Sequence, residues 1–409
     1  MKRIILGLIV VTLFGCSKEI IKPIPLDVPV VNNVNLPKIL YYSKTSYELK
    51  NSSINYLNVD SLRAILHIAN IGKSNGTNNL GYVYVDMNND GREDIFYPYT
   101  TNGGLSKPAV LLNYGNYYEN DNSMLPTDYV GNENTRKTLV GDYNNDSLPD
   151  LFLINQGYED PTTGRFNKEA NTLLLSNKVT HKYELGILPN IGIDFWHGGA
   201  SGDLNNDGNI DIVVSAGLKS VLLIGDGKGN FTANTLKDLT NGAHMTIEIV
   251  DVNKDGQNDI IMTGDEGIDN PPAYLSYSKI YFNNNGSFDN QLIMCDVNSD
   301  WRIVEDIACE DIDGDGINEI ILDRQTSFGS AKLSFYKFVN GYTKMKDVTT
   351  TFINNDIISL THSGGWCPRM NLIKTNNRVM IRTDVTPSDL SQSYTIKYLT
   401  QNPTTKLFQ

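Results

Sequence analysis

Residues 203–216 read DLNNDGNIDIVVSA, an acidic loop-like phrase followed at once by a run of apolar, mostly β-branched residues. The same nine-residue phrase, Asp-x-Asn/Asp-x-Asp-Gly/Ser-x-x-Asp/Glu, occurs five times, with starts 48 to 61 residues apart. The copies lie at 86–94, 142–150, 203–211, 251–259 and 311–319. A period of this length is typical of a unit that buries its faces only against neighbouring units, so the chain is predicted to be a repeat protein.

The phrase has the chemistry of a calcium loop. Calcium takes six to eight oxygen ligands on a tightly curled backbone. Side chains at positions 1, 3, 5 and 9 supply oxygens, and the carbonyl at position 7 adds one. Glycine at position 6 suits a turn with positive φ. The predicted ligands are Asp86, Asn88, Asp90, Arg92 and Asp94; Asp142, Asn144, Asp146, Leu148 and Asp150; Asp203, Asn205, Asp207, Asn209 and Asp211; Asp251, Asn253, Asp255, Gln257 and Asp259; and Asp311, Asp313, Asp315, Ile317 and Glu319.

Two of the five loops depart from the common pattern. The second has Ser147 and Pro149, so we expect it to bind calcium least tightly. The fifth has four carboxylates where each of the others has three, so charge count alone predicts the tightest binding there. We expect about five Ca²⁺ ions per chain.

The formal net charge of −13 is concentrated in these loops. Without metal the clustered carboxylates would repel one another, so calcium binding is expected to be coupled to folding. An acidic chain of this kind has no basic patch for nucleic acid, and we expect no nucleic-acid partner.

Short strand-like segments flank every loop. EF-hands and dockerin modules need a ligand at position 12 and a following helix, whereas position 12 here is Tyr97, Leu153, Val214, Met262 or Leu322. Apolar runs such as DLFLIN, DIVVSA and EIILDR follow the loops instead. Three to four short strands in each repeat predict an all-β fold, a β-propeller.

Over residues 80–325 the sequence resembles the FG-GAP/VCBS repeat type found in integrin α-chain propellers and bacterial surface proteins. The resemblance implies a propeller with Ca²⁺ in the loops that join the first and second strands of each blade.

The rest of the chain follows the pattern less closely. Residues 361–381 align with the third repeat but have Arg369, Asn371 and Lys374 at ligand positions, which predicts a sixth blade without metal. Residues 40–80 and the final SYTIKYL would then pair the chain ends, either as a seventh blade or as the missing strands of the sixth. We expect seven blades, with six as the alternative, in a propeller spanning 40–409.

The amino terminus resembles a bacterial lipoprotein signal. Lys2 and Arg3 precede an apolar run that ends in Leu-Phe-Gly-Cys at Cys16, and this run is too short for a permanent membrane span. We expect a signal peptide at 1–15, a lipidated Cys16, an extended tether over 16–39, and a lipid-anchored protein of the outer membrane, periplasmic or surface-exposed. The alternative is a plain secretory signal with an incidental cysteine.

Three cysteines remain: Cys295, Cys309 and Cys367. Cys309 and Cys367 fall at the same place in successive repeats, where a disulfide would suit an oxidising compartment. The alternative is buried thiols.

A second set of polar residues lies six or seven positions before each loop, where the inner strand begins. They are Arg136, His197, His244, Glu305 and His362, with Trp196 and Trp366 close by. They predict a polar, aromatic-edged pocket near the central axis that suits an acidic or neutral sugar. Alternatively, histidine is only a turn residue inherited with the repeat. Two long loops on the same face offer rim contacts at Tyr158, Asp160, Arg165, Asp265, Glu266 and Asp269.

Two functions remain open. The first is a surface lipoprotein whose propeller binds a glycan or an extracellular protein, for adhesion or recognition, with structural calcium. The second is a polysaccharide lyase in which His197 or His244 abstracts a proton while Arg136 or a metal neutralises a uronate. The chain has no nucleophile elbow, phosphate loop or zinc motif, so the non-catalytic function is favoured.

Overall fold

The computed structural model describes residues 38–40, 81–92, 94–98, 104–114, 118–160, 163, 165–216, 219–234, 244–264, 266, 277–294, 303–325, 330–354, 359–361, 366–374, 379–386 and 395–408. The chain divides into two units, 1–30 and 31–409, and all described residues belong to the second. The expected signal peptide, Cys16 and most of the tether therefore lie outside the described residues. Neither of the two helical segments described, η1 (Asn122–Met124) and α2 (Thr349–Phe352), could cross a membrane.

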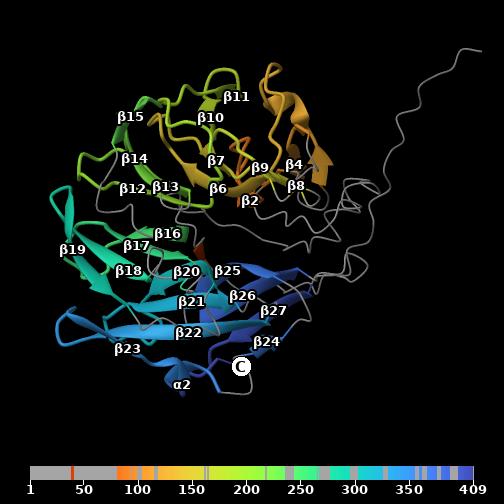
Figure 1. The fold of residues 1–409 in the computed structure, drawn as a ribbon. Coiled ribbons are helices and arrows are strands. Elements are labelled where there is room, and N and C mark those ends of the chain that lie inside the picture. The colour runs from red at the N-terminus through yellow and green to blue at the C-terminus, as the bar shows by residue number, and fades with distance from the viewer. Residues whose placement is uncertain are drawn as a thin grey trace, which may run out of the picture. The chain divides into compact units, whose positions relative to one another are not determined.

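The described residues form consecutive antiparallel sheets, whose strands Figure 1 labels. The first sheet holds β2 (Val83–Val85), β3 (Asp94–Tyr97), β4 (Ala109–Asn113) and β5 (Tyr118–Asn120). The second holds β6 (Thr135–Gly141), β7 (Asp150–Asn155), β10 (Thr172–Asn177) and β11 (Lys182–Leu185). The third holds β12 (Gly198–Gly202), β13 (Asp211–Ala216), β14 (Lys219–Gly225) and β15 (Phe231–Asn234).

The fourth sheet holds β16 (His244–Val250), β17 (Asp259–Gly264), β18 (Lys279–Asn284) and β19 (Ser287–Ile293). The fifth holds β20 (Ile303–Glu310), β21 (Glu319–Gln325), β22 (Ser330–Val339) and β23 (Lys344–Asp347), with β24 (Ser359–Thr361) added beside β22. A separate hairpin, β8 (Tyr158–Asp160) and β9 (Arg165–Asn167), leaves the second sheet between β7 and β10.

The sixth sheet joins the two ends of this unit. It contains β25 (Trp366–Lys374), β26 (Val379–Thr386) and β27 (Thr395–Thr400), and β1 (Lys38–Leu40) pairs with β25. The carboxyl-terminal strand β27 overlaps the segment SYTIKYL that one of the two sequence alternatives assigned to the sixth blade. The amino-terminal strand differs from the prediction, because β1 includes Lys38 and Ile39, which were assigned to the tether. Residues 41–80 lie outside the described residues, so the blade count stays a prediction. The alignment of Arg369, Asn371 and Lys374 with loop positions was wrong, because all three lie inside β25, where Arg369 pairs with Asp384 of β26. The prediction of a sixth blade without metal stays a prediction.

The core consists of separate apolar layers between consecutive sheets. In β7, Leu151 and Leu153 pack toward the first sheet, while Phe152 and Ile154 pack toward the third. Successive side chains of a strand point to opposite faces, so a strand buried on both faces needs an unbroken apolar run. All six residues of β7 are buried. This explains why continuous hydrophobic segments follow the loops.

The first strands of the sheets contact one another in sequence order, from β6 through β12, β16 and β20 to β25. Stacked four-stranded sheets with neighbouring first strands make the fold all-β and propeller-like.

Candidate functional site

All five acidic loops connect the first and second strands of a sheet, as the sequence predicted. They follow β2, β6, β12, β16 and β20 and end where β3, β7, β13, β17 and β21 begin. The repeated phrase therefore occupies the same place in five successive sheets.

Hydrogen bonds turn the side chains of each loop inward, as the first loop illustrates. Asp86 accepts from the amide of Asp90 through Oδ1 (3.0 Å) and from the amide of Gly91 through Oδ2 (2.8 Å). Asn88 Oδ1 accepts from the same Asp90 amide at 3.0 Å. Asp90 Oδ1 in turn accepts from the amide of Arg92 at 2.9 Å. The side-chain oxygens of positions 1, 3 and 5 are thus held around one curl of backbone.

The backbone of the loops is left-handed at two positions. Position 6 has positive φ in every copy, from 71° at Ser147 to 91° at Gly316. Position 4 is also left-handed, for example Asn89 at 57° and Lys254 at 61°. The positive φ at position 6 confirms the turn that the sequence predicted there, whereas the left-handed residue at position 4 was not predicted. Asparagine there tolerates the left-handed region better than most residues.

The acidic residue at position 9 fastens each loop to its sheet. In the first loop, Asp94 is fully buried and accepts from the amide of Met87 through Oδ2 and from the amide of Asn113 through Oδ1, both at 2.8 Å. Asn113 ends β4, so this carboxylate links the loop to the third strand. From the sequence we predicted only metal binding at position 9, and the hydrogen bonds that link the loop to the sheet were not predicted.

Burial raises the pKa of the position 9 carboxyls. The raised values are about 7 for Asp94, Asp150, Asp259 and Glu319 and about 6 for Asp211. In the first loop, the neighbouring charges of Asp90 and Asp86 add to the effect of burial. A buried carboxylate surrounded by like charges is stabilised by a nearby cation.

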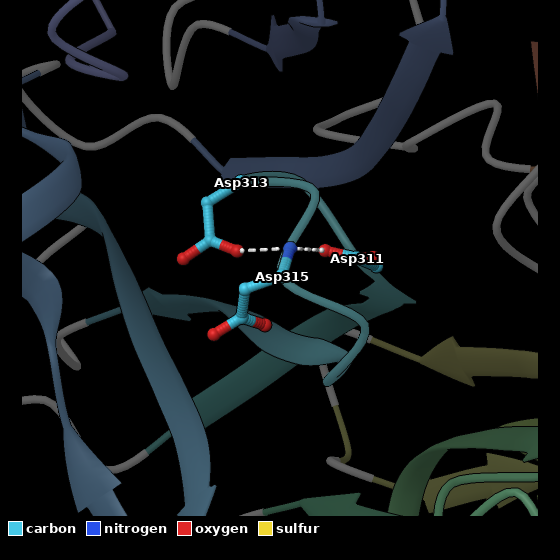
Figure 2. Close-up of side chains that lie close together, drawn as sticks. All are labelled: Asp311, Asp313 and Asp315. Carbon is cyan, nitrogen blue, oxygen red and sulfur yellow. Dashed lines mark hydrogen bonds between the residues drawn. The ribbon is translucent and has the colours of Figure 1, made fainter.

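The donor set fits a hard cation. In the fifth loop, Asp311, Asp313 and Asp315 offer carboxylate oxygens that all lie within 4.8 Å of one another, so this triad could hold a metal ion. Figure 2 shows oxygens of Asp311 and Asp313 converging on the amide of Asp315. Loops one to four have the same hydrogen-bonded curl, with an asparagine oxygen in place of the second carboxylate. Oxygen-only donors of this kind are the ligands calcium prefers.

The structure shows a contact of position 7 that the sequence did not predict. The predicted ligand there is a backbone carbonyl, and the structure adds that the amide of the same residue donates to position 5 in every loop. The donors are Arg92, Leu148, Asn209, Gln257 and Ile317. The carbonyl ligand stays a prediction.

At the opposite end of the first strands, a β-bulge recurs at one position. The strand registers skip Arg136 in β6, Met245 in β16 and Glu305 in β20. Each of these residues stands six positions before its loop, as does His197, immediately before β12. A bulged residue is released from the ladder and its side chain is re-aimed. The sequence placed these polar residues six or seven positions before each loop, and the structure shows that the bulged position is the sixth.

Three of the predicted site residues come together here. Arg136 Nη2 donates to Glu305 Oε2 at 2.5 Å, and this pair joins the second and fifth sheets across 169 residues of sequence. The Arg136 side chain is 13% exposed and that of Glu305 only 1%. Arg136 also acts electrostatically on His197. We call Arg136, His197 and Glu305 the bulge cluster.

The histidine of the bulge cluster is held neutral. Burial, and then the positive charge of Arg136, lower the pKa of His197 well below its ordinary value. Its ring packs against Phe195 with centroids 4.7 Å apart. His197 Nδ1 and Glu305 Oε1 are buried and have no hydrogen-bond partner among the described residues. A buried polar atom without a partner costs about 1–3 kcal/mol, so both atoms favour a group that can hydrogen-bond to them.

Trp196 does not edge a pocket as predicted. It is fully buried in the apolar layer between the second and third sheets, with Lys219 Nζ 4.9 Å above its ring. Trp196 precedes β12 and packs into this apolar layer, whereas the rings of its two neighbours, Phe195 and His197, contact each other. His362 lies outside the described residues, as do the side chains of His244 and Trp366. His244 itself pairs in register with Gly264 and is not the bulged residue of its strand.

Glu266 was predicted as a rim contact and lies instead in the interior. It is 1% exposed and forms an ion pair with Arg324 of β21, also 1% exposed, including a contact from Nη2 at 3.3 Å. Ser278 donates a further hydrogen bond to Glu266. The acidic residue anchors the loop because a buried carboxylate needs partners. Asp265 and Asp269 lie outside the described residues.

The cysteine prediction is tested only in part. Cys309 is 3% exposed and packs between the fourth and fifth sheets. Cys295 and the side chain of Cys367 lie outside the described residues, so a disulfide stays a prediction.

Comparison with protein families finds one FG-GAP-like repeat, which matches residues 203–262. This range begins at the third acidic loop and ends within β17, so it contains two complete loops. No curated protein matches the sequence.

Several solved structures are similar to the chain. A lectin of Agrocybe aegerita, described as recognising non-reducing terminal N-acetylglucosamine, is 14% identical, with 78% of this chain and 85% of that chain covered and a TM-score of 0.47. A hypothetical selenium-binding protein of Sulfolobus tokodaii is 12% identical, with 77% and 73% covered and a TM-score of 0.47. A GH43 β-xylosidase/α-arabinofuranosidase from a compost microbial metagenome, in complex with xylotriose, is 10% identical, with 65% and 91% covered and a TM-score of 0.39.

Proposed function

We propose that this protein is a calcium-stabilised, lipid-anchored surface protein that binds a neutral glycan at the bulge cluster. The observation that carries the proposal is the pairing of Arg136 with Glu305 beside a neutral His197, with one polar atom each of His197 and Glu305 left without a partner.

The charges of the cluster favour a neutral ligand over an acidic one. Glu305 offsets the charge of Arg136, and His197 adds none, so the cluster has no net charge to attract a uronate. A sugar hydroxyl can both donate and accept. It can therefore donate to Glu305 Oε1 and bond to His197 Nδ1 in either tautomer, which makes a polyhydroxylated ligand the best match.

A glycan-binding screen followed by titration calorimetry tests this function. We expect binding to neutral oligosaccharides that weakens at least tenfold in Glu305→Gln or His197→Ala. A matched control is Glu184→Gln on the outer strand β11, which should bind as the wild type does. Equal binding by all variants, or binding only to uronate polymers, would refute the assignment.

A polysaccharide lyase is the second candidate, because a neutral His197 with an unpartnered Nδ1 is in the state that a general base requires. The pairing of Arg136 with Glu305 weighs against it, since the guanidinium is already engaged. Ultraviolet absorbance of unsaturated product from any uronate polymer, lost in His197→Ala, would favour the lyase.

Calcium is proposed to act structurally. Acidic loops that curl their oxygens inward, far along the strands from the bulge cluster, would be stabilised by Ca²⁺ and would stabilise the sheets in turn. Calorimetric unfolding with EDTA and with millimolar CaCl₂, combined with elemental analysis, tests this role. We expect a large calcium-dependent rise in melting temperature and several ions per chain; the absence of both would exclude it.

The lipid anchor rests on the sequence around Cys16. We propose an outer-membrane location in a bacterium, with the propeller-like domain in the periplasm or at the surface. Cys16→Ser should move the protein from the membrane fraction to the soluble fraction, and protease accessibility of whole cells separates the two locations.

A further inference from the structure

A lysine lies among the carboxylates of the fifth loop. Lys337 of β22 places Nζ 2.7 Å from Asp313 Oδ2, 2.9 Å from Asp315 Oδ2 and 2.5 Å from Glu319 Oε1. The lysine side chain is 13% exposed. Its charge therefore sits at the centre of the predicted metal site.

The ammonium group matches this site in number and kind. It has three N–H donors and no acceptor, and three separate carboxylates receive them. The remaining acidic residue, Asp311, accepts from the backbone amides of Asp315 and Gly316. Loop five thus already has a cation in contact with three of its four carboxylates.

Among the described residues, no lysine stands opposite position 9 in the other four loops. Glu319 faces Lys337 in the ladder between β21 and β22. The corresponding ladders of the first four sheets, continued by one residue, place an apolar side chain opposite position 9. These residues are Leu112, Leu175, Ile224 and Phe282.

The lysine and the additional carboxylate occur together. Position 3 is asparagine in loops one to four and aspartate only in loop five. Asp313 brings one extra negative charge, and Lys337, its partner at 2.7 Å, brings one positive charge. Loop five with its lysine therefore carries the same net charge as loops two and three. The expectation that loop five binds most tightly ignored this partner.

We propose that Lys337 takes the place of the calcium ion in loop 311–319, so that the fifth repeat is held by an internal cation and needs no metal. The inference rests on the proposed calcium binding of the other loops. To enter loop five, a calcium ion would have to displace an ammonium that is tethered at high effective concentration and is already in contact with three of the four carboxylates.

Counting bound calcium on the purified full-length protein tests the inference. We expect one ion in each of loops one to four, and one additional ion per chain in Lys337→Met, which keeps the length of the side chain and removes the charge. The control is Lys279→Met on β18, the third strand of the fourth sheet, whose lysine lies near Tyr281 and Gln291. It should leave the count unchanged.

A second pair of variants keeps the test informative if Lys337→Met does not fold. Asp311→Ala in loop five should leave the wild-type calcium count unchanged, whereas Asp251→Ala in loop four should lower it by one. Five ions in the wild type, or a count that Asp311→Ala lowers, would overturn the inference alone. No bound ion in the wild type or in Lys337→Met would refute the proposed calcium role and the inference with it.

Discussion

Ser147 stands where the other four loops have glycine, at a left-handed φ of 71°. Replacing it by glycine should stabilise the protein. A Cβ built on Gly91, Gly208, Gly256 or Gly316 would meet no atom within 4 Å, so the side chain at this position packs against nothing. The amide of residue 147 donates to Asp142 Oδ2 at 2.9 Å, and glycine keeps that bond. The substitution therefore changes only the conformational cost of the backbone.

The size of the effect follows from two opposing contributions. The left-handed region destabilises a residue with a Cβ by about 1–2 kcal/mol. Glycine in turn destabilises the folded protein by about 0.4–1 kcal/mol, because it increases the entropy of the unfolded chain. The net gain for Ser147→Gly is about 0.5–1 kcal/mol. The reciprocal change in loop three, Gly208→Ser, should cost a similar amount, so the two variants should differ by about 1–2 kcal/mol.

Urea unfolding, with the midpoint compared at equal slope, measures both variants in EDTA and in calcium. Because the hydrogen bonds of the loop are present without an ion, we expect the gain in both conditions. A gain only in calcium would mean that the ion orders the loop. A loss of stability in Ser147→Gly, or no cost in Gly208→Ser, would refute the conformational argument.

Other perturbations give equally direct tests. Arg136→Met and Glu305→Gln should each destabilise by about 3 kcal/mol, and the double variant by less than the sum, in a urea double-mutant cycle; additive losses would contradict the ion pair. His197 stays neutral in the fold while the unfolded chain takes up a proton, so its contribution to stability should fall by up to about 1.4 kcal/mol per pH unit below about pH 6.5, whereas the raised pKa values of the position 9 carboxyls contribute in the opposite direction. His197→Gln should flatten this slope, and an unchanged slope would count against a buried neutral imidazole. Arg324→Met should cost about 3–5 kcal/mol because Glu266 stays buried without its partner, and a thermal midpoint equal to that of the wild type would disprove it.

Some features of the site were predictable because their causes are local. The calcium-type ligands lie within nine consecutive residues, and the left-handed turn at position 6 depends only on backbone sterics there. The prediction for Glu266 failed for the opposite reason. A polar residue in a long loop looks solvent-exposed until a partner such as Arg324 is found 58 residues away.

The spacing of the acidic phrases and the apolar runs behind them were enough to predict an all-β repeat with loops between first and second strands, because periodicity and loop chemistry act over short distances. The tertiary structure decided which residues meet. The bulge that selects Arg136 and Glu305 is a property of strand register, and their contact depends on how the second and fifth sheets pack. Lys337 enters loop five through cross-strand pairing of β21 with β22. Contacts between distant segments depend on the register and stacking of whole sheets, which no local pattern encodes.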